Sequence, residues 1–253
     1  MNAIKLLLVL SVMFLVTSCD KGTDGPDGVL GCYENVQQLP PNVSCIDFIS
    51  SDPRICDVTP FGTFTLSNIA KESFPWFCMD TGDKISYINA VGDEIEFTIS
   101  VKNFTETLTI FAADTCASDP MKLEGLCVQS QVAIMQLETP NDTRIVRMGL
   151  LTGPDNSNVT MGEVGDYFQI VEQGIGNQFV TAYTGVVDQR SLPFSSLPQE
   201  IFEADFMLLG KAFTDVTYMD FGPGETLTQY YYSPISGLVG FKDVDGTEWV
   251  LND

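Results

Sequence analysis

The hydrophobic pattern is clearest from residue 94 onward, where apolar and polar positions alternate. Ile95, Phe97, Ile99 and Val101 are separated by polar or charged residues, and this period of two predicts a strand with one face against a core. A turn is expected near Asn103–Glu106, and shorter apolar stretches follow between clusters of Gly, Pro, Asn and Asp. They predict strands at Thr107–Ala112, Gly125–Glu138, Arg144–Leu151, Tyr167–Glu172 and Gln178–Val187. The alternating strand and Thr107–Ala112 are expected to form a hairpin across the turn near Asn103–Glu106, and Thr107–Ala112 is also expected to pair with Gly125–Glu138.

The last fifty residues carry the same pattern and predict an antiparallel meander. Its strands are expected at Phe206–Leu209, Ala212–Phe221, Leu227–Ser233, Gly237–Asp243 and Thr247–Leu251. Turns are expected at Gly210-Lys211, at Gly222-Pro223-Gly224 and at Asp245-Gly246. The Asp-Gly pair favours a type I′ turn, in which both central residues have positive φ.

Regularly spaced short strands separated by turn residues are typical of sandwiches and barrels. We therefore expect residues 83–253 to form an all-β domain, an antiparallel meander folded into a β-sandwich or an open half-barrel. One short helix is expected at Pro198–Glu203, because proline suits the first turn of a helix. Residues 32–82 contain four cysteines and one expected strand at Gly62–Ile69. They predict an irregular region that depends on disulfides more than on a core of its own.

The chain contains seven cysteines. The first is Cys19, and the other six are Cys32, Cys45, Cys56, Cys78, Cys116 and Cys127. An even number in an exported chain indicates disulfides. Closed zinc sites use cysteines two to four residues apart, whereas the nearest pair here is separated by 11 positions and no His is present. Disulfides are therefore favoured over a thiolate metal site.

The expected strands suggest how these cysteines pair. Cys116 follows Thr107–Ala112 and Cys127 lies near the start of Gly125–Glu138, so both are expected at the mouth of one hairpin. A disulfide needs two Cα atoms about 4.4–6.8 Å apart, which such a position provides. We predict a Cys116–Cys127 bond, with the other four cysteines pairing within residues 32–78. The simplest arrangement of those four is Cys32–Cys45 and Cys56–Cys78.

The N-terminus has the layout of a secretory signal. Lys5 precedes an apolar run over residues 6–16, which is shorter than the roughly 20 residues of a membrane-spanning helix. Leu15-Val16-Thr17-Ser18-Cys19 resembles a bacterial lipobox. The resemblance implies that residues 1–18 are removed and that the Cys19 thiol carries a diacylglycerol. Two or more acyl chains give a stable membrane anchor.

The alternative is an ordinary signal peptide cut after Ser18, with Cys19 joining a disulfide of a secreted protein. Sequons that begin at Asn42, Asn103, Asn141 and Asn158 fit this alternative, since such tripeptides accept glycans in secreted chains. In either case, residues 19–31 are rich in Gly and Asp and predict a flexible tether.

Composition excludes several functions. The chain has a net charge of −22, and −23 without residues 1–18, which contain one Lys and no acid. Such a charge repels nucleic acid. With 44 % hydrophobic and 11 % aromatic residues the chain can still form a core. The absence of His excludes Ser-His-Asp and Cys-His catalysis and His-ligated metals, and we expect no cofactor and no metal.

Three short segments are candidates for chemistry. Gly174–Phe179 resembles a dinucleotide loop but lacks its third glycine, so a hairpin turn is favoured. Asp243–Glu248 contains three carboxylates that could bind Ca²⁺ or act as an acid pair. Tyr230–Tyr232 should place its outer tyrosines on one face of a strand and Tyr231 on the other, and core packing is favoured over ligand contact. We predict no catalytic residue.

The C-terminal stretches resemble those of small surface and outer-membrane lipoproteins of Bacteroidota. The matching segments are Gly210–Val216, Tyr231–Ser233, Gly237–Asp243 and Trp249–Leu251. They cover about a fifth of the chain, and the resemblance implies a location and a fold without a particular activity. We therefore expect a non-enzymatic protein, lipid-anchored to the outer membrane, that has a binding or structural role toward an unknown protein or small molecule. The alternatives are a carrier of a lipid or hydrophobic ligand in an open half-barrel, a carboxylate-dependent glycoside hydrolase, and a secreted protein.

Overall fold

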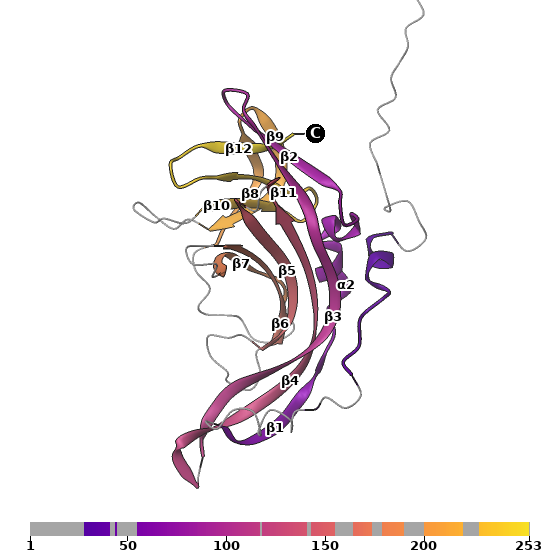
Figure 1. The fold of residues 1–253 in the computed structure, drawn as a ribbon, viewed down its shortest axis with the longest axis vertical. Coiled ribbons are helices and arrows are strands. Elements are labelled where there is room, and N and C mark those ends of the chain that lie inside the picture. The colour runs from indigo at the N-terminus through magenta and orange to yellow at the C-terminus, as the bar shows by residue number, and fades with distance from the viewer. Residues whose placement is uncertain are drawn as a thin grey trace, which may run out of the picture.

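The computed structural model describes residues 28–40, 44, 55–116, 118–140, 143–154, 164–173, 179–189, 200–219 and 228–252. Within these ranges the chain forms one large mixed sheet (Figure 1). Its strands are β1 (Ile55–Phe64), β2 (Lys84–Asn89), β3 (Glu94–Cys116), β4 (Asp119–Glu138), β5 (Ile145–Pro154), β6 (Val164–Gln173), β7 (Phe179–Gln189), β8 (Glu200–Leu208), β9 (Lys211–Met219), β10 (Gln229–Ser233), β11 (Gly237–Lys242) and β12 (Glu248–Asn252). The described helices are η1 (Gly28–Tyr33), α2 (Asn68–Glu72) and η2 (Pro75–Cys78). The expected all-β fold is confirmed.

The sheet is open. Neighbouring strands follow the order β7-β6-β5-β4-β3-β2-β12-β11-β10-β9-β8, with antiparallel pairing throughout. The path ends at β7 on one side and β8 on the other, so the described strands do not close into a barrel. β1 pairs in parallel with residues 123–130 of β4, beyond the point where β5 ends. β1, β3 and β4 therefore form a curved arm that extends away from the rest of the sheet (Figure 1).

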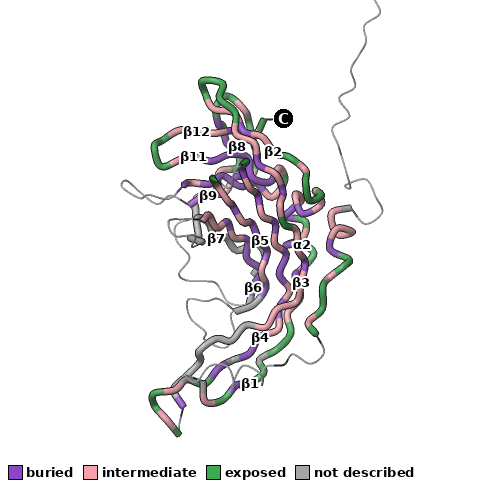
Figure 2. The backbone as a smooth tube through the Cα atoms, viewed as in Figure 1, coloured by how far each residue is buried: buried purple, intermediate pink, exposed green. Residues whose placement is uncertain are grey.

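The principal core lies on the concave side of this bent sheet. Phe168 of β6 stacks on Tyr232 of β10 with ring centroids 3.9 Å apart, so distant parts of the strand order face each other. Along β4 and β5, buried residues alternate with less buried ones (Figure 2). Their inward side chains are Ala133, Met135, Leu137, Val146, Met148 and Leu150, each at most 1 % exposed. This alternation is the expected strand period.

A second, smaller core lies on the opposite face of β10, β11 and β12. It consists of Phe206, Leu208, Val216, Tyr231, Val239 and Val250. The β8–β9 hairpin covers this face, because its side chains pack against those of β10, β11 and β12. Lys211 Nζ of the hairpin also donates to the Leu251 carbonyl of β12 at 2.6 Å. β10 and β11 are consequently buried on both faces along nearly their whole length. That position accounts for the continuous apolar run at residues 238–241, since strands covered on both sides lose polar alternation.

Glycine allows the hairpin to approach β11. A Cβ at Gly240 would lie 2.3 Å from Leu208 Cδ2 and 2.4 Å from the Trp249 carbonyl oxygen. At Gly237, where φ is +78°, a Cβ would lie 2.3 Å from Nε1 of Trp76. Both glycines in the segment 237–240 are therefore required by close contacts.

The cysteine-rich segment belongs to the principal core. Ser67 caps α2, accepting the Ala70 amide at its Oγ (3.2 Å). The strand expected at Gly62–Ile69 is therefore cut short, because β1 ends at Phe64 and α2 begins at Asn68. Phe74 and Phe77 of the following turn are at most 1 % exposed. The expected disulfide-bonded irregular region is confirmed, and its buried side chains join the core of the sheet rather than forming a core of their own. The sequence of this segment shows no hydrophobic periodicity, because individual side chains enter the core rather than one face of a helix.

β3 is longer than the sequence indicated. The turn expected near Asn103–Glu106 is wrong, because β3 continues to Cys116 and pairs with β4 throughout. A bulge between Ile99 and Val101 shifts the side-chain alternation. Val101 is therefore 42 % exposed, while Phe104 enters the core at 7 %. The buried face of this strand was expected to include Val101, and it includes Phe104 instead.

Two turns and a helix also differ from expectation. The helix expected at Pro198–Glu203 is wrong over its described residues, because Glu200 begins β8 and pairs with β9. In the Asp243–Thr247 turn only Gly246 has positive φ, so it is a three-residue loop rather than type I′. Positive φ at two successive residues occurs instead at Leu209 and Gly210, between paired Leu208 and Lys211. The segment Gly222-Pro223-Gly224 lies outside the described residues.

The disulfide pairing predicted from the sequence is wrong. The bonds are Cys32–Cys78 and Cys56–Cys116, with Cα separations of 5.2 and 6.4 Å; Cys127 is disulfide-bonded as well. Cys116 lies at the tip of the β3–β4 hairpin opposite Asp119, whereas Cys127 lies opposite Ile110 further along the strands. Residues taken for a loop between these cysteines are strand, and β1 places Cys56 beside the tip. The remaining predicted partner, Cys45, lies outside the described residues.

The expected tether is shorter than residues 19–31. Gly28 already begins η1, and Val29 packs against the principal core. The Val29 carbonyl also lies 3.7 Å from Cys78 Sγ, next to the Cys32–Cys78 bond. Within the described residues, no helix combines the length and the apolar character needed to cross a membrane.

Candidate functional site

Aromatic side chains of the described N-terminal segment pack on the concave side of the sheet. Phe74 packs edge-on against Phe168 with ring centroids 5.3 Å apart. Phe77 and Tyr33 stack with centroids 4.6 Å apart. A hydrophobic ligand carrier requires a concavity that side chains leave open. Here α2 and η2 form a plug, defined as Leu66–Cys78, that occupies the concave side.

Polar side chains on the sheet hold the plug by its backbone. Gln131 Oε1 accepts the Leu66 amide at 3.1 Å, and Asp166 Oδ2 accepts the Ser67 amide at 3.0 Å. From β10, the Tyr232 hydroxyl donates to the Ser73 carbonyl. These bonds satisfy backbone groups that would otherwise be buried without partners, so the plug is fixed from both sides of the core.

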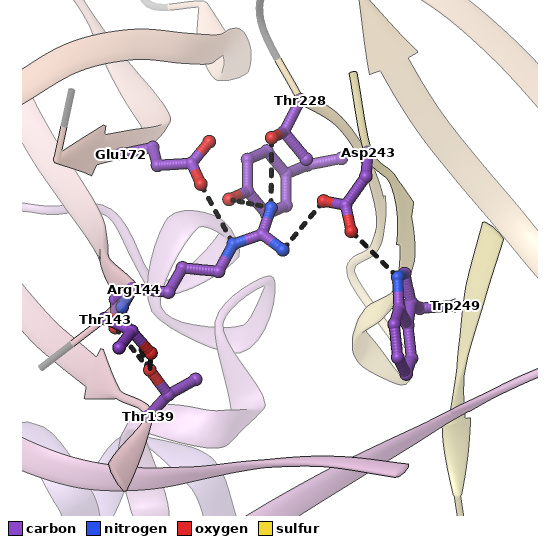
Figure 3. A network of polar contacts seen from close by, with 8 residues as sticks. Thr139, Thr143, Arg144, Glu172, Thr228, Asp243 and Trp249 are labelled. Atoms are coloured by element: carbon purple, nitrogen blue, oxygen red, sulfur yellow. Dashed lines mark hydrogen bonds and ion pairs between the residues drawn. The ribbon is translucent and has the colours of Figure 1, made fainter. Parts of the chain in front are cut away.

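A second polar cluster surrounds Arg144, which precedes β5. Its Nε donates to Glu172 Oε1 of β6 at 2.9 Å, and its Nη1 lies 2.8 Å from Asp243 Oδ1 (Figure 3). Nη2 donates to Thr228 Oγ1 at 3.0 Å and to the Tyr230 hydroxyl at 3.3 Å. The guanidinium carbon lies 4.4 Å from the centroid of the Phe241 ring. Arg144 thus connects β6 to β10 and β11 across the core.

The electrostatics of this cluster favour a fixed ion network. Burial by itself lowers the pKa of Arg144, but Tyr230, Glu172 and Asp243 outweigh it, so the pKa lies above its ordinary value. The Arg144 side chain is 13 % exposed. Burial raises the pKa of Tyr230, which keeps this hydroxyl neutral as a partner. The Glu172 and Asp243 carboxylates are both bound to Arg144, whose charge is permanent. This arrangement is suited to holding strands together rather than to transferring protons.

The carboxylates of Asp243–Glu248 do not converge on a metal site. Asp243 also accepts the Trp249 indole N–H at 2.9 Å (Figure 3). Asp245 accepts the Thr247 amide at 2.9 Å, and this bond lowers the pKa of the fully exposed Asp245 carboxyl. Across the described part of the chain, no group of three or more Cys, Asp or Glu residues is placed to hold a metal ion.

The tyrosine run is confirmed as packing. Tyr230 and Tyr232 belong to the principal core, and Tyr231 belongs to the second core. All three are at most 6 % exposed. Of the dinucleotide-like segment, residues 174–178 lie outside the described residues, and β6 and β7 pair antiparallel on either side of them.

A cleft opens at the rim of the principal core, between η2, β2, β3 and β12. Its volume is about 260 Å³. Its apolar lining residues are Trp76, Met79, Ile85 and Leu251. Its polar lining residues are Lys84, Ser86, Glu96 and Asn252. Lys84 Nζ lies 2.7 Å from Glu96 Oε1, so the two charges in the cleft neutralise each other.

Sequence reasoning missed both the Arg144 cluster and the cleft. Arg144 had one available signal, because basic residues are scarce in this chain, with 12 against 34 acidic residues. No sequence signal indicated Trp76, because the cleft joins segments that are more than 150 residues apart in the chain. Cys19, the expected lipidation site, lies outside the described residues.

No protein-family model matches the chain, and neither a curated protein nor a solved structure shows significant similarity to it.

Proposed function

We propose that the protein is an exported lipoprotein, anchored in the outer membrane by a lipid on Cys19, with a β-body that binds a partner without catalysis. The state of the cysteines carries this proposal, because all five that the structure describes are disulfide-bonded. Disulfides form and persist outside the cytoplasm. The secretory layout of residues 1–18 supports the same compartment.

The number of cysteines supports lipidation over an ordinary secretion signal. Seven cysteines cannot all pair within one chain. Cys19 and Cys45 remain beyond the five that are bonded, and one of them is left over once Cys127 has an intramolecular partner. Cys19 follows the lipobox-like Leu15–Ser18, and a diacylglyceryl thioether would use the odd thiol.

The anchor would hold the body near the bilayer. Gly28, the first described residue, comes nine residues after Cys19. A fully extended chain of that length spans at most about 30 Å. The Cys32–Cys78 bond links η1 to η2. The anchored N-terminal segment would therefore be joined covalently to the plug, next to the rim cleft.

Binding is favoured over the two other functions for separate reasons. The described plug packs on the concave side, where a hydrophobic carrier would need open space. Glu172 and Asp243 are bound to Arg144, whereas a glycoside hydrolase needs one of its two carboxylates as a proton donor. The rim cleft, with apolar and polar walls, has the mixed lining of ligand sites.

Detergent-phase partitioning of the full chain, expressed in a Gram-negative host, tests the anchor. The parent and a Ser18→Gly variant, which retains a small residue before Cys19, should enter the detergent phase. Cys19→Ala should remain in the aqueous phase or stay uncleaved. If exported and cleaved Cys19→Ala partitions like the parent, the lipid anchor is excluded.

A further inference from the structure

We propose that the rim cleft binds one uncharged sugar residue, free or at the end of a glycan. This inference rests on the binding role proposed above and names the ligand class of that site. The cleft is formed by residues that are far apart in sequence, from Trp76 to Asn252. Its walls combine an indole ring with hydroxyl, amide and carboxylate groups, and each of these has a counterpart in sugar chemistry.

The indole is held in a fixed position. Gly237 lies directly against it, since a Cβ there would be 2.3 Å from both Nε1 and Cε2 of Trp76. The backbone that follows Trp76 is also fixed, because the Phe77 and Met79 amides donate to the Phe74 and Trp76 carbonyls. A rigid aromatic side chain offers an apolar surface at small entropic cost, and it suits the C–H face of a pyranose ring.

The hydrogen-bonding groups of the cleft are available to a ligand. Among the described residues, the Trp76 indole N–H, the Ser86 hydroxyl and the Asn252 amide have no hydrogen-bond partner in the protein. Together they provide donors and acceptors beside the apolar wall. A ring that carries several hydroxyl groups can use both kinds, whereas an aliphatic ligand would leave them unpaired.

The charge and the volume of the cleft limit the class of ligand further. Lys84 and Glu96 form an ion pair in the cleft, so the site is locally neutral although the chain carries −22. A neutral site gives no net attraction to an anion or a cation. The volume of about 260 Å³ is below the usual range of about 300–1,000 Å³ for drug-sized ligands. One sugar ring therefore fits better than an oligosaccharide lying along the surface.

Fluorescence can report on this site directly. The chain has two tryptophans, so Trp249→Phe leaves Trp76 as the sole indole. The lipidated mature chain in detergent micelles would be titrated with methyl glycosides of glucose, galactose, mannose and N-acetylglucosamine, and with acetate and phosphate as charged probes. At least one glycoside should change Trp76 emission saturably, with a dissociation constant of about a millimolar for so small a ligand.

Variants assign the response to the cleft. Ser86→Ala and Asn252→Ala should each weaken binding about fivefold, as expected for the loss of one hydrogen bond. Glu94→Gln, an exposed change on the same strand as Glu96, should leave binding unchanged. The proposal is overturned if no glycoside saturates, if only the charged probes do, or if binding is equal in both alanine variants and the parent. Lipidation of the same preparation is measured separately by mass, so a negative titration leaves the anchor proposal standing.

Discussion

At the residue scale, Arg144 connects the two parts of the sheet that face each other. Its guanidinium contacts Glu172 on one side and Asp243 on the other, and both carboxylates are largely shielded from solvent. An arginine suits this position because its donors are arranged in a planar fork and its charge is permanent. The ring of Phe241 beneath it adds a cation–π contact.

Arg144→Met should lower the free energy of unfolding by about 3 kcal/mol, since removing one partner leaves buried charge without compensation. Urea unfolding followed by circular dichroism measures the change. Lys242→Met is the matched control, because the side chain of this half-buried cation on β11 makes no hydrogen bond or ion pair with any residue that the structure describes, and a change below about 0.5 kcal/mol is expected. Equal losses in the two variants would show that Arg144 does not clamp the strands.

Gly240 is the second residue on which packing depends. Gly240→Ala should destabilise by about 2 kcal/mol, because the added methyl group meets the Trp249 carbonyl and Leu208 at contact distances that force a shift. Gly62→Ala is the control, since its Cβ would meet only the Phe64 ring at 3.4 Å. A Gly240→Ala protein as stable as the control would contradict the placement of the β8–β9 hairpin over β11.

At the element scale, strands with local signals were predictable and long-range arrangements were not. β10, β11 and β12 coincide closely with their expected ranges, because apolar runs and turn residues mark their ends. The continuous β3–β4 hairpin was missed because the bulge after Ile99 changes which residues face the core. The plug was missed because Phe74 and Phe77 show no period. The rim cleft depends on the register of β12 on β2, which no local pattern specifies.

The disulfides provide a test at this scale. Non-reducing peptide mapping should recover Cys32 linked to Cys78 and Cys56 linked to Cys116. Because Cys19 is proposed to carry lipid, Cys127 is expected with Cys45. A Cys127–Cys19 peptide would instead support the secreted alternative, in which Cys19 belongs to a disulfide.

At the scale of the whole molecule, buried tyrosines make stability depend on alkaline pH. Burial raises the pKa of Tyr33, Tyr87 and Tyr230 above the ordinary value of 10. In the unfolded chain these groups ionise near pH 10, whereas in the folded protein they stay neutral. Their contribution is therefore present below pH 10 and is lost as pH rises further, at a rate that approaches about 1.4 kcal/mol per pH unit for each tyrosine once the unfolded chain is fully ionised.

Tyr87→Phe should reduce this dependence. The Tyr87 hydroxyl donates to the Leu238 carbonyl at 2.9 Å, so the variant should lose about 1 kcal/mol at neutral pH. Between pH 10 and 11 its free energy of unfolding should fall by about 1 kcal/mol less than that of the parent, because a tyrosine of the unfolded chain goes from half to mostly ionised over this interval. Urea unfolding at pH 9, 10 and 11 measures both slopes, and parallel curves would contradict the assignment of a raised pKa to Tyr87.

In the proposed lipoprotein, the disulfide-bonded body would be held close to a membrane, because only nine residues of sequence lead from Cys19 to Gly28. The orientation would place η1 and the neighbouring cleft on the anchored side. This proposed arrangement depends on whether the Cys19 thiol carries a lipid. If Cys19 carries no lipid, the body is a secreted disulfide protein and its binding partner need not lie at the envelope.

Mass spectrometry of the N-terminal peptide from the mature chain, purified from membranes, examines that thiol directly. The lipoprotein proposal predicts a chain that begins at Cys19 and carries a diacylglyceryl thioether, with residues 1–18 removed. An unmodified N-terminus at Cys19 with its sulfur in a disulfide, or a chain that retains residues 1–18, would contradict it.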